Sequence, residues 1–379
     1  MGHDVVRAFA PGRTEIAGNH TDHQGGRVIA AALSRGVDMR IRPRNDERAT
    51  LQSEGFAPVS LSVRELDPVD GERKTTAALV RGVIAGINRM APGKVRGFDA
   101  FASSTLPSGG GLSSSAAFEV ALAGGLNLLF LDNALTPVDL ARCGQFAEQH
   151  YFGKPCGLMD QLTSAWGAVQ LMDFAEEAQP HCVTLDVDFE NAGYAVVLVD
   201  THCDHSAFTQ EYAQVSEDMR AVAQLFGAPT LSRVAKERFF EQLASVRMRL
   251  GDTAALRGIH YYHEMDLVDA RAAALQAGDY AAFIEATCRS SISSAQYLQN
   301  VSVFGAAQQP AMVALALADC ALEGTGACRI HGGGFGGSVQ AYVPLDRLDS
   351  FTRQMDGQFG AGSCLVCSIS RKGVQAQWE

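Results

Sequence analysis

Six polar side chains that could contact a substrate are concentrated near the start of the chain. Residues 12–26 read GRTEIAGNHTDHQGG and lie between two apolar runs. The six are Arg13, Glu15, Asn19, His20, Asp22 and His23. Such a mixture of fixed donors and acceptors is what a polyhydroxylated ligand needs. A solvated turn would have the same composition, so both interpretations stay open on these residues alone.

A second segment combines three glycines with three serines. Residues 107–115 read PSGGGLSSS, and the proline-free apolar stretch that follows, residues 116–130, has helical spacing. Glycine lets a backbone approach a phosphate, and a helix N-terminus offers unpaired N–H groups and a positive dipole end. We therefore predict a phosphate site here, in preference to a flexible turn with an N-cap serine. No GxxxxGK[ST] sequence occurs, so the loop lacks the lysine of a Walker A motif.

Two acidic residues follow this loop. Asp160 stands among apolar neighbours in residues 156–161, CGLMDQ, and Glu148 lies twelve residues earlier, at the end of an expected helix. An aspartate in this setting is either a helix cap or a functional base. We disfavour the alternative of Cys156 as a nucleophile with His150, because no oxyanion arrangement is indicated nearby.

A metal site is a further alternative. Residues 20–23 and 202–205 share the spelling HxDH, and two such tetrads could build a zinc or di-metal hydrolase site. Histidines three residues apart also occur by chance, and no other carboxylate pattern supports a metal centre. We therefore favour a ligand-binding loop over a metal hydrolase.

Composition excludes several other classes. The chain has 379 residues and a formal net charge of −11, which is not the electrostatic footprint of a nucleic-acid-binding protein or of one that docks on anionic membranes. Residues 1–4 show no basic segment followed by an apolar core, so we expect no signal peptide, and no uninterrupted apolar stretch of about 18 residues occurs. Nine cysteines without disulfide spacing suit a reducing cytoplasm, and Cys364 and Cys367 are expected in a core strand. We expect a cytoplasmic protein.

The pattern of apolar residues predicts a mixed α and β chain. Strand structure is expected at residues 5–10, 27–42 (with turns), 95–102, 195–199 and 339–343, and helices at residues 75–90, 116–130, 139–150, 210–299 (in part) and 311–323. Pro11 and Gly12 indicate a turn after the first strand. A soft boundary near residues 175–190 divides the chain into expected domains at residues 1–180 and 181–379.

Three of these segments, together with a glycine-rich segment that precedes the last expected strand, resemble the GHMP small-molecule kinases, and the galactokinase family among them. The segments are residues 11–22, 109–117, 156–161 and the glycine-rich residues 332–337, GGGFGG, and their order and separation also fit. The resemblance implies an α+β fold of two domains, ribosomal-S5-like at the N-terminus and ferredoxin-like at the C-terminus, with the active site between them. It also implies ATP-dependent phosphorylation of galactose at the C1 hydroxyl, by a monomer or weak homo-oligomer.

The resemblance implies a role for each matching residue. Asp160 would take the proton of the C1 hydroxyl, with Arg13 keeping that carboxylate ionised and offsetting phosphoryl charge. Ser115 and Glu148 would hold Mg²⁺ on ATP. The nucleotide phosphates would lie on Gly109, Gly110, Gly111, Leu112, Ser113, Ser114 and Ser115. The sugar would contact Asn19, His20, Thr21, Asp22, Gly157 and Tyr212.

Two residues depart from the family pattern. Asn19 stands where the family usually has glutamate, near the expected C6 hydroxyl, and His331 stands where threonine is frequent. Losing a negative charge at position 19 keeps galacturonate, or another C6-modified galactose, open as a substrate. N-acetylgalactosamine also stays open. Mevalonate or homoserine fits the loop of residues 19–22 less well. A non-catalytic sugar and ATP sensor is disfavoured because Arg13, Asp160, Ser115 and Glu148 are all retained.

Overall fold

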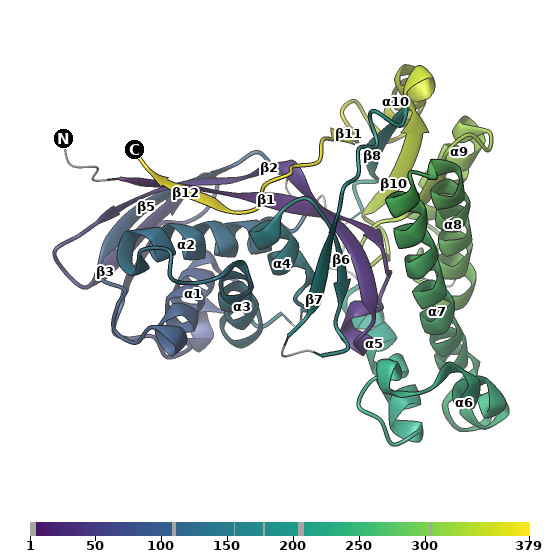
Figure 1. Ribbon diagram of the computed structural model, residues 1–379, viewed down its shortest axis with the longest axis horizontal. Helices are drawn as coiled ribbons and strands as arrows, with labels where there is room; N and C mark the ends of the chain where they lie inside the picture. Colours follow the sequence, from purple (N-terminus) through teal and green to yellow (C-terminus); the bar gives the residue numbers. More distant parts are fainter. Residues whose placement is uncertain (1–4, 108–110, 155, 177–178, 204–207, 304) are drawn as a thin grey trace.

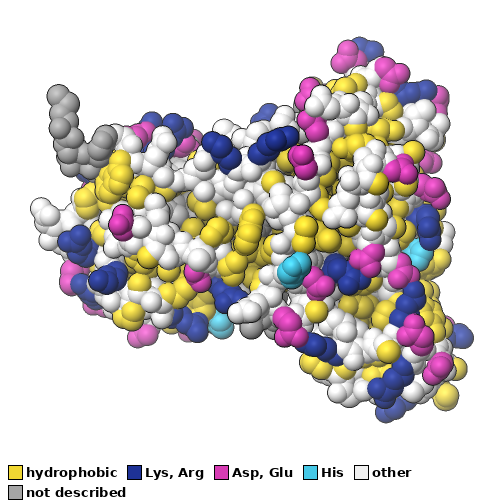
Figure 2. Space-filling view, in the orientation of Figure 1, with side chains coloured by type: hydrophobic (Ala, Val, Ile, Leu, Met, Phe, Trp, Pro, Cys, Tyr) yellow, Lys and Arg dark blue, Asp and Glu magenta, His cyan; other side chains and the backbone are white. Residues whose placement is uncertain are grey.

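The structure is a computed structural model that describes residues 5–107, 111–154, 156–176, 179–203, 208–303 and 305–379. Gly109 and Gly110 of the expected phosphate loop lie outside the described residues. Acidic and basic side chains are interspersed over the face seen in Figure 2.

An eight-stranded sheet forms one half of the molecule (Figure 1). Its strands are β1 (Val6–Ala17), β2 (Arg27–Pro43), β3 (Arg48–Ser53), β4 (Val59–Ser62), β5 (Phe98–Ser104), β6 (Val169–Asp173), β7 (His181–Leu185) and β12 (Gln375–Trp378). The order along the main path is β12-β1-β2-β5-β3-β4, antiparallel except for the parallel β3–β5 pair. The long strand β2 pairs with β6 through its first residues and with β5 through its last.

Four helices cover one face of this sheet (Figure 1): α1 (Thr76–Met90), α2 (Ser114–Leu131), α3 (Pro137–Ala147) and α4 (Met159–Trp166). Helix α2 is apolar around its whole circumference because it lies between the sheet and the other helices, packing on β1, β2, α3 and α4. It is long and apolar enough to cross a membrane, but 67% of it is buried inside the protein. A buried core helix passes the same test of length and composition.

The other half contains a four-stranded antiparallel sheet of order β11-β8-β10-β9. These strands are β8 (Tyr194–Asp200), β9 (Ala327–Ile330), β10 (Ser338–Pro344) and β11 (Cys364–Cys367). The helices of this half are α5 (Thr209–Leu225), α6 (Lys236–Glu241), α7 (Leu243–Ala277), α8 (Tyr280–Ser293), α9 (Pro310–Leu322) and α10 (Leu348–Phe359). Helices α8 to α10 pack on the sheet, and α7 packs on α5 and α8. The chain then returns to the first half, where β12 pairs with β1 (Figure 1).

One buried ion pair joins β1 to the C-terminal half, and a second, within α7, reaches the end of β1 through hydrogen bonds. Arg329 of β9 binds the Glu15 carboxylate and donates to the Glu15 carbonyl at 3.0 Å. Within α7, Arg271 pairs with Glu264. Arg271 also donates to the Ile16 carbonyl at 3.2 Å, and Glu264 accepts the Gly18 N–H at 3.0 Å. Breaking a buried pair of this kind typically costs about 3–5 kcal/mol, so the end of β1 is held from both sides.

Most of the expected elements are confirmed, with one clear correction. The expected turn at Pro11 and Gly12 is wrong, because β1 continues through them to Ala17. A register shift between Pro11 and Arg13 interrupts the pairing with β2 there, which accommodates a residue without an N–H. Arg13 and Glu15 therefore lie on a strand, not in a loop.

Two further expectations concern the C-terminal half. Strand β11 is confirmed, but Cys364 and Cys367 are only partly buried on an edge strand, and all nine cysteines are free. The division near residue 180 stays a prediction. Strands β7 and β12, which follow that residue, both belong to the N-terminal sheet.

The close packing of α1 on α3 gives a test of the fold. A Cβ added at Gly82 would lie 2.6 Å from Ala147 Cα, so Gly82→Ala should lower the free energy of unfolding by about 1–3 kcal/mol. Gly357 in α10 has open space around it, and Gly357→Ala should instead stabilise the protein by up to about 1 kcal/mol. Urea unfolding of both variants measures this. A Gly82→Ala variant as stable as the parent would contradict the packing.

Candidate active site

An ion pair between the buried Arg13 and the partly exposed Asp160 lies at the centre of the site. Arg13 on β1 donates from Nε to Asp160 Oδ1 at 2.7 Å and from Nη2 to Oδ2 at 3.0 Å, a bidentate contact with the first turn of α4. Its third nitrogen, Nη1, donates to the Gly111 carbonyl at 2.6 Å. Arg13 therefore ties a strand, a helix and the glycine-serine loop together.

Asp160 stays ionised despite its burial. Burial favours the neutral acid, but the Arg13 guanidinium, the Ser113 hydroxyl and the nearby Lys154 ammonium hold the pKa of Asp160 below its ordinary value. Ser113 donates to Asp160 Oδ2 from a left-handed backbone conformation, φ 58°. This conformation is unfavourable for a residue other than glycine, and such strain concentrates at functional sites.

A second carboxylate lies on the other side of the loop. Glu148 begins a π-helical turn, Glu148–Phe152, directly after α3. Its Oε1 accepts from Ser115 Oγ at 2.9 Å and from Lys154 Nζ at 2.8 Å, and its Oε2 accepts from Gln161 Nε2 at 2.8 Å. The structure thus brings together the two residues expected to hold Mg²⁺, and adds Lys154 and Gln161, for which sequence reasoning assigned no role.

The oxygen atoms at Glu148 and Ser115 are suitable ligands for Mg²⁺. Mg²⁺ prefers oxygen ligands, and the Ser115 hydroxyl and Glu148 carboxylate converge in the structure. Glu119 is fully buried nearby, and its Oε1 has no hydrogen-bond partner among the described residues. Burial and the neighbouring Glu148 carboxylate raise the pKa of Glu119 well above its ordinary value.

The expected sugar residues His20, Asp22, Gly157 and Tyr212 lie around the same space. A Cβ added at Gly157 would come within 2.3 Å of Asp22 Oδ2, so a larger residue here would displace the Asp22 carboxylate. Burial, with a contribution from Asp160, raises the pKa of Asp22 to about 6. The Tyr212 ring lies 5.2 Å from the His20 ring, and the Tyr212 residue is 46% exposed.

Two histidines in this loop form a chain of hydrogen bonds. His20 Nε2 donates to the Gly333 carbonyl at 3.0 Å, and His20 Nδ1 lies 3.1 Å from His23 Nε2. The Gln24 amide donates to His23 Nδ1 at 3.2 Å. These contacts are all satisfied when both rings are neutral, with His23 Nε2 donating to His20 Nδ1.

Asn19 and Thr21 already have protein partners. The Asn19 side chain is fully buried, donates to Glu15 Oε1 at 3.3 Å and to the Gly332 carbonyl, and accepts from Asn300 Nδ2 at 2.7 Å. Thr21 Oγ1 donates to the carbonyls of Gly18 and Arg27 at 2.9 and 2.7 Å. Their expected contacts with a sugar stay predictions.

His331, the second departure from the family pattern, lies beneath the glycine-serine loop. Its Nε2 is 3.1 Å from Thr14 Oγ1 and accepts the Glu15 N–H at 3.3 Å. A Cβ added at Gly111 would be 3.5 Å from His331 Nδ1. His331 therefore connects β1 to the loop that contacts Arg13.

The remaining loop residues are placed as follows. Leu112 is buried, and its carbonyl accepts the Arg13 N–H at 3.2 Å. Ser114 begins α2, so Ser113, Ser114 and Ser115 lie at the start of a long helix. The predicted entry of the serines into a buried helix is confirmed.

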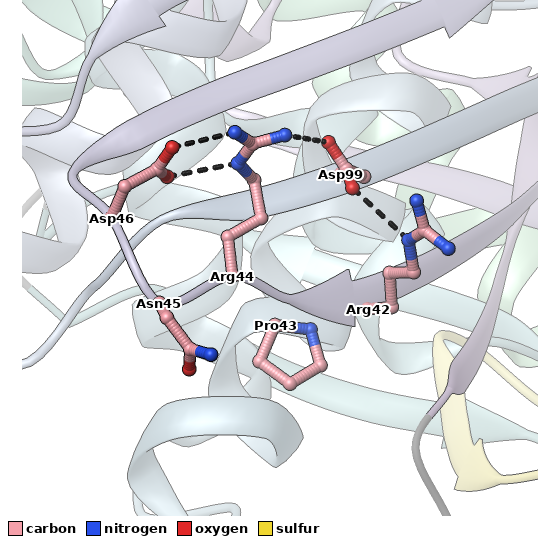
Figure 3. Close-up of a pocket in the computed structure, with 6 residues that line it drawn as sticks. All are labelled: Arg42, Pro43, Arg44, Asn45, Asp46 and Asp99. Atoms are coloured by element: carbon pink, nitrogen blue, oxygen red, sulfur yellow. Dashed lines mark hydrogen bonds and ion pairs between the residues drawn. The ribbon is translucent and has the colours of Figure 1, made fainter.

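Over the described residues, no group of three or more His, Cys, Asp or Glu is arranged to hold a metal. Asp204 and His205 of the second HxDH tetrad fall outside that part of the chain. A hollow where β2 ends and β5 begins in the large sheet also carries no free charge (Figure 3). There Arg44 contacts both Asp46 and Asp99, and Arg42 contacts Asp99, so two cations face two carboxylates.

Two family models match this chain. The model for the GHMP kinases N terminal domain matches residues 78–168, and the galactokinase galactose-binding signature matches residues 1–43. A galactokinase of Streptomyces coelicolor is 33% identical over 359 residues, covering 93% of this chain and 88% of that protein. The chain belongs to the galactokinase family.

Other galactokinases agree with this assignment. A galactokinase of Glaesserella parasuis is 29% identical over 366 residues, covering 91% of this chain and 87% of that protein. The crystal structure of Lactococcus lactis galactokinase complexed with galactose matches the fold with a TM-score of 0.83 at 24% identity, covering 98% of this chain and 95% of that one. The expected GHMP kinase fold is confirmed.

The neutral histidines predict a pH-dependent stability. Burial lowers the pKa of His20 to about 3 and of His23 to about 4. Below about pH 6.5 the unfolded chain binds protons that the folded protein does not. These two residues therefore make the free energy of unfolding smaller as the pH decreases. His23→Gln should make that slope shallower between pH 6 and 4.5, by up to about 1.4 kcal/mol per pH unit.

Urea unfolding across this pH range measures the slope, with His150→Gln, which removes an exposed histidine, as control. The raised pKa of Asp22 acts in the opposite sense but is present in each protein, so the difference between variants reports His23. An unchanged slope in His23→Gln would show that this ring is not held neutral.

Proposed function

We propose that this protein phosphorylates galactose at the C1 hydroxyl with ATP and Mg²⁺, giving galactose 1-phosphate and ADP. The observation that carries the proposal is the Arg13–Asp160 pair, buried beside the glycine-serine loop and next to Asp22 and Gly157. The family matches support galactose as the substrate.

Asp160 acts as the base in this proposal. A base must be ionised before the reaction, and Arg13 and Ser113 keep Asp160 so. The C1 hydroxyl gives its proton to an oxygen of Asp160, and Arg13 then stands beside the negative charge of the transferring phosphoryl group. Phosphoryl transfer needs little more than positioning and charge neutralisation, which these groups supply.

Ser115 and Glu148 would hold Mg²⁺ against the ATP phosphates. The ion, when bound, offsets phosphate charge. The N–H groups at the start of α2 favour anions through the helix dipole, so the loop residues Gly111 to Ser115 would bind the phosphates. Gly109 and Gly110 complete that loop in the proposal.

The sugar would be held by His20, Asp22, Gly157 and Tyr212. The buried side chains of Asn19 and Thr21 would fix the conformation of the same loop through their hydrogen bonds. Location in the cytoplasm, and a monomer or weak homo-oligomer, stay predictions. Retention of the paired Arg13 and Asp160 favours an enzyme over a non-catalytic sensor.

Removing the base tests the assignment. Asp160→Asn keeps the shape of the side chain but cannot accept the proton, so kcat should fall about 10²–10⁴-fold while galactose binding largely survives. A coupled assay of ADP release and calorimetry with galactose measure the two effects. Asp349→Asn, at an exposed position in α10, is the matched control and should keep parental turnover. Full activity of Asp160→Asn would refute the role of Asp160.

Asn19 allows a test of substrate range. The hypothesis that a neutral residue here admits a C6 carboxylate predicts measurable turnover of galacturonate. Asn19→Asp replaces the amide with a carboxylate in a side chain of similar size. The added negative charge should repel a C6 carboxylate and so lower turnover of galacturonate more than that of galactose. Kinetics on both sugars measures this. Undetectable galacturonate turnover by a protein that phosphorylates galactose would end the hypothesis.

A further inference from the structure

The mechanism above leaves one cation of the site without a role. Lys154 Nζ binds Glu148 Oε1 at 2.8 Å, the same oxygen that accepts from Ser115 Oγ at 2.9 Å. The ammonium therefore lies beside the first turn of α2, where phosphates are expected. It also contributes to lowering the pKa of Asp160, on the other side of the loop.

The backbone fixes the position of Lys154. The N–H groups of Gly153 and Lys154 both donate to the Glu148 carbonyl at 3.0 Å. They close the π-helical turn, a feature that recurs at functional sites. The side chain is nevertheless 54% exposed, whereas the side chain of Glu148 is 1% exposed. The carboxylate is thus fixed in the interior, and the flexible lysine stem is free to move its head on the solvent side.

We propose that Lys154 is a phosphate-binding residue of this kinase. Its ammonium exchanges the Glu148 carboxylate for a phosphate oxygen of ATP, while Glu148 becomes available to a divalent cation. Arg13 and Lys154 then flank the glycine-serine loop from two sides. The inference rests on the proposed function. In it, Lys154 takes the place of the Walker A lysine, which the glycine-serine loop lacks.

The charge of Lys154 is secure. The ordinary pKa of a lysine is about 10.4, so an ammonium that is half exposed to solvent carries its positive charge at neutral pH. A lysine with a flexible stem binds phosphate as a point charge, so it can change partners without a fixed geometry.

Nucleotide binding without turnover tests the proposal. Calorimetry with ATP in EDTA compares the parent with Lys154→Met, Lys154→Arg and the exposed control Lys94→Met. Lys154→Met should weaken ATP binding about tenfold or more, as expected for loss of a charge-assisted hydrogen bond, while adenosine binding stays unchanged. Lys154→Arg should retain part of the affinity, and Lys94→Met all of it. ATP binding by Lys154→Met equal to that of the parent would overturn the proposal.

A double-mutant cycle distinguishes phosphate binding by Lys154 from a purely structural role, in which Lys154 only neutralises Glu148. Glu148→Gln releases Lys154 from its carboxylate, so ATP should bind this variant in EDTA at least as tightly as the parent. Adding Lys154→Met to Glu148→Gln should again weaken ATP binding about tenfold. If Lys154→Met has no effect in the Glu148→Gln background, the lysine only neutralises Glu148 and the proposal fails.

Failure of the proposed function would be seen in the assay of ADP release, separately from the calorimetry that tests Lys154. The unmodified protein would then release no ADP with galactose, ATP and Mg²⁺, whatever the calorimetry shows. Loss of ATP affinity in Lys154→Met would still support a phosphate contact, because that readout requires no sugar and no turnover.

Discussion

The bidentate pair of Arg13 and Asp160 is the interaction on which the site depends. Arg13 is buried and its charge would be costly without a partner, and the partly exposed Asp160 carboxylate supplies the opposite charge. Because Arg13 also donates to the Gly111 carbonyl, the pair fixes the distance between the base and the glycine-serine loop. Positioning of the proposed base and its ionisation therefore have the same physical cause.

The fold brings Arg13 to that place by extending β1 beyond its expected end. The strand passes through the irregular pairing at Pro11 and is then held at Glu15 by Arg329. Further along, Gly18 is bound by Glu264 of α7. The first strand therefore contacts both halves of the molecule, and its polar residues meet groups that lie hundreds of positions away in the sequence.

The sequence predicts those helices and strands whose signal lies in the local spacing of apolar residues and glycines. Apolar spacing located α1, α2 and β8, and glycines followed by serines located the start of α2. Pro11 and Gly12 were misinterpreted because a proline at a strand irregularity has the same local signature as a turn. The residues themselves could not show that pairing with β2 resumes beyond them.

The supporting contacts of the site could not be predicted for a different reason. Asn300 binds Asn19 and Gln161 joins Glu119 to Glu148 only because distant elements pack together. Lys154 has no motif around it, and its contact with Glu148 depends on a π-helical turn that apolar periodicity does not reveal. The contacts of Asn19 and Thr21 with other parts of the protein were likewise not visible in the sequence, and their expected contacts with a sugar stay predictions.

The dependence of Asp160 on Arg13 can be measured directly in the pH profile of kcat/KM for galactose. Arg13→Met removes the main cation that lowers the pKa of Asp160, so the base should become protonated at higher pH. The acidic limb of the profile should then move upward by about one to three pH units relative to the parent protein. An acidic limb at the same pH in both proteins would contradict the central role given to this pair.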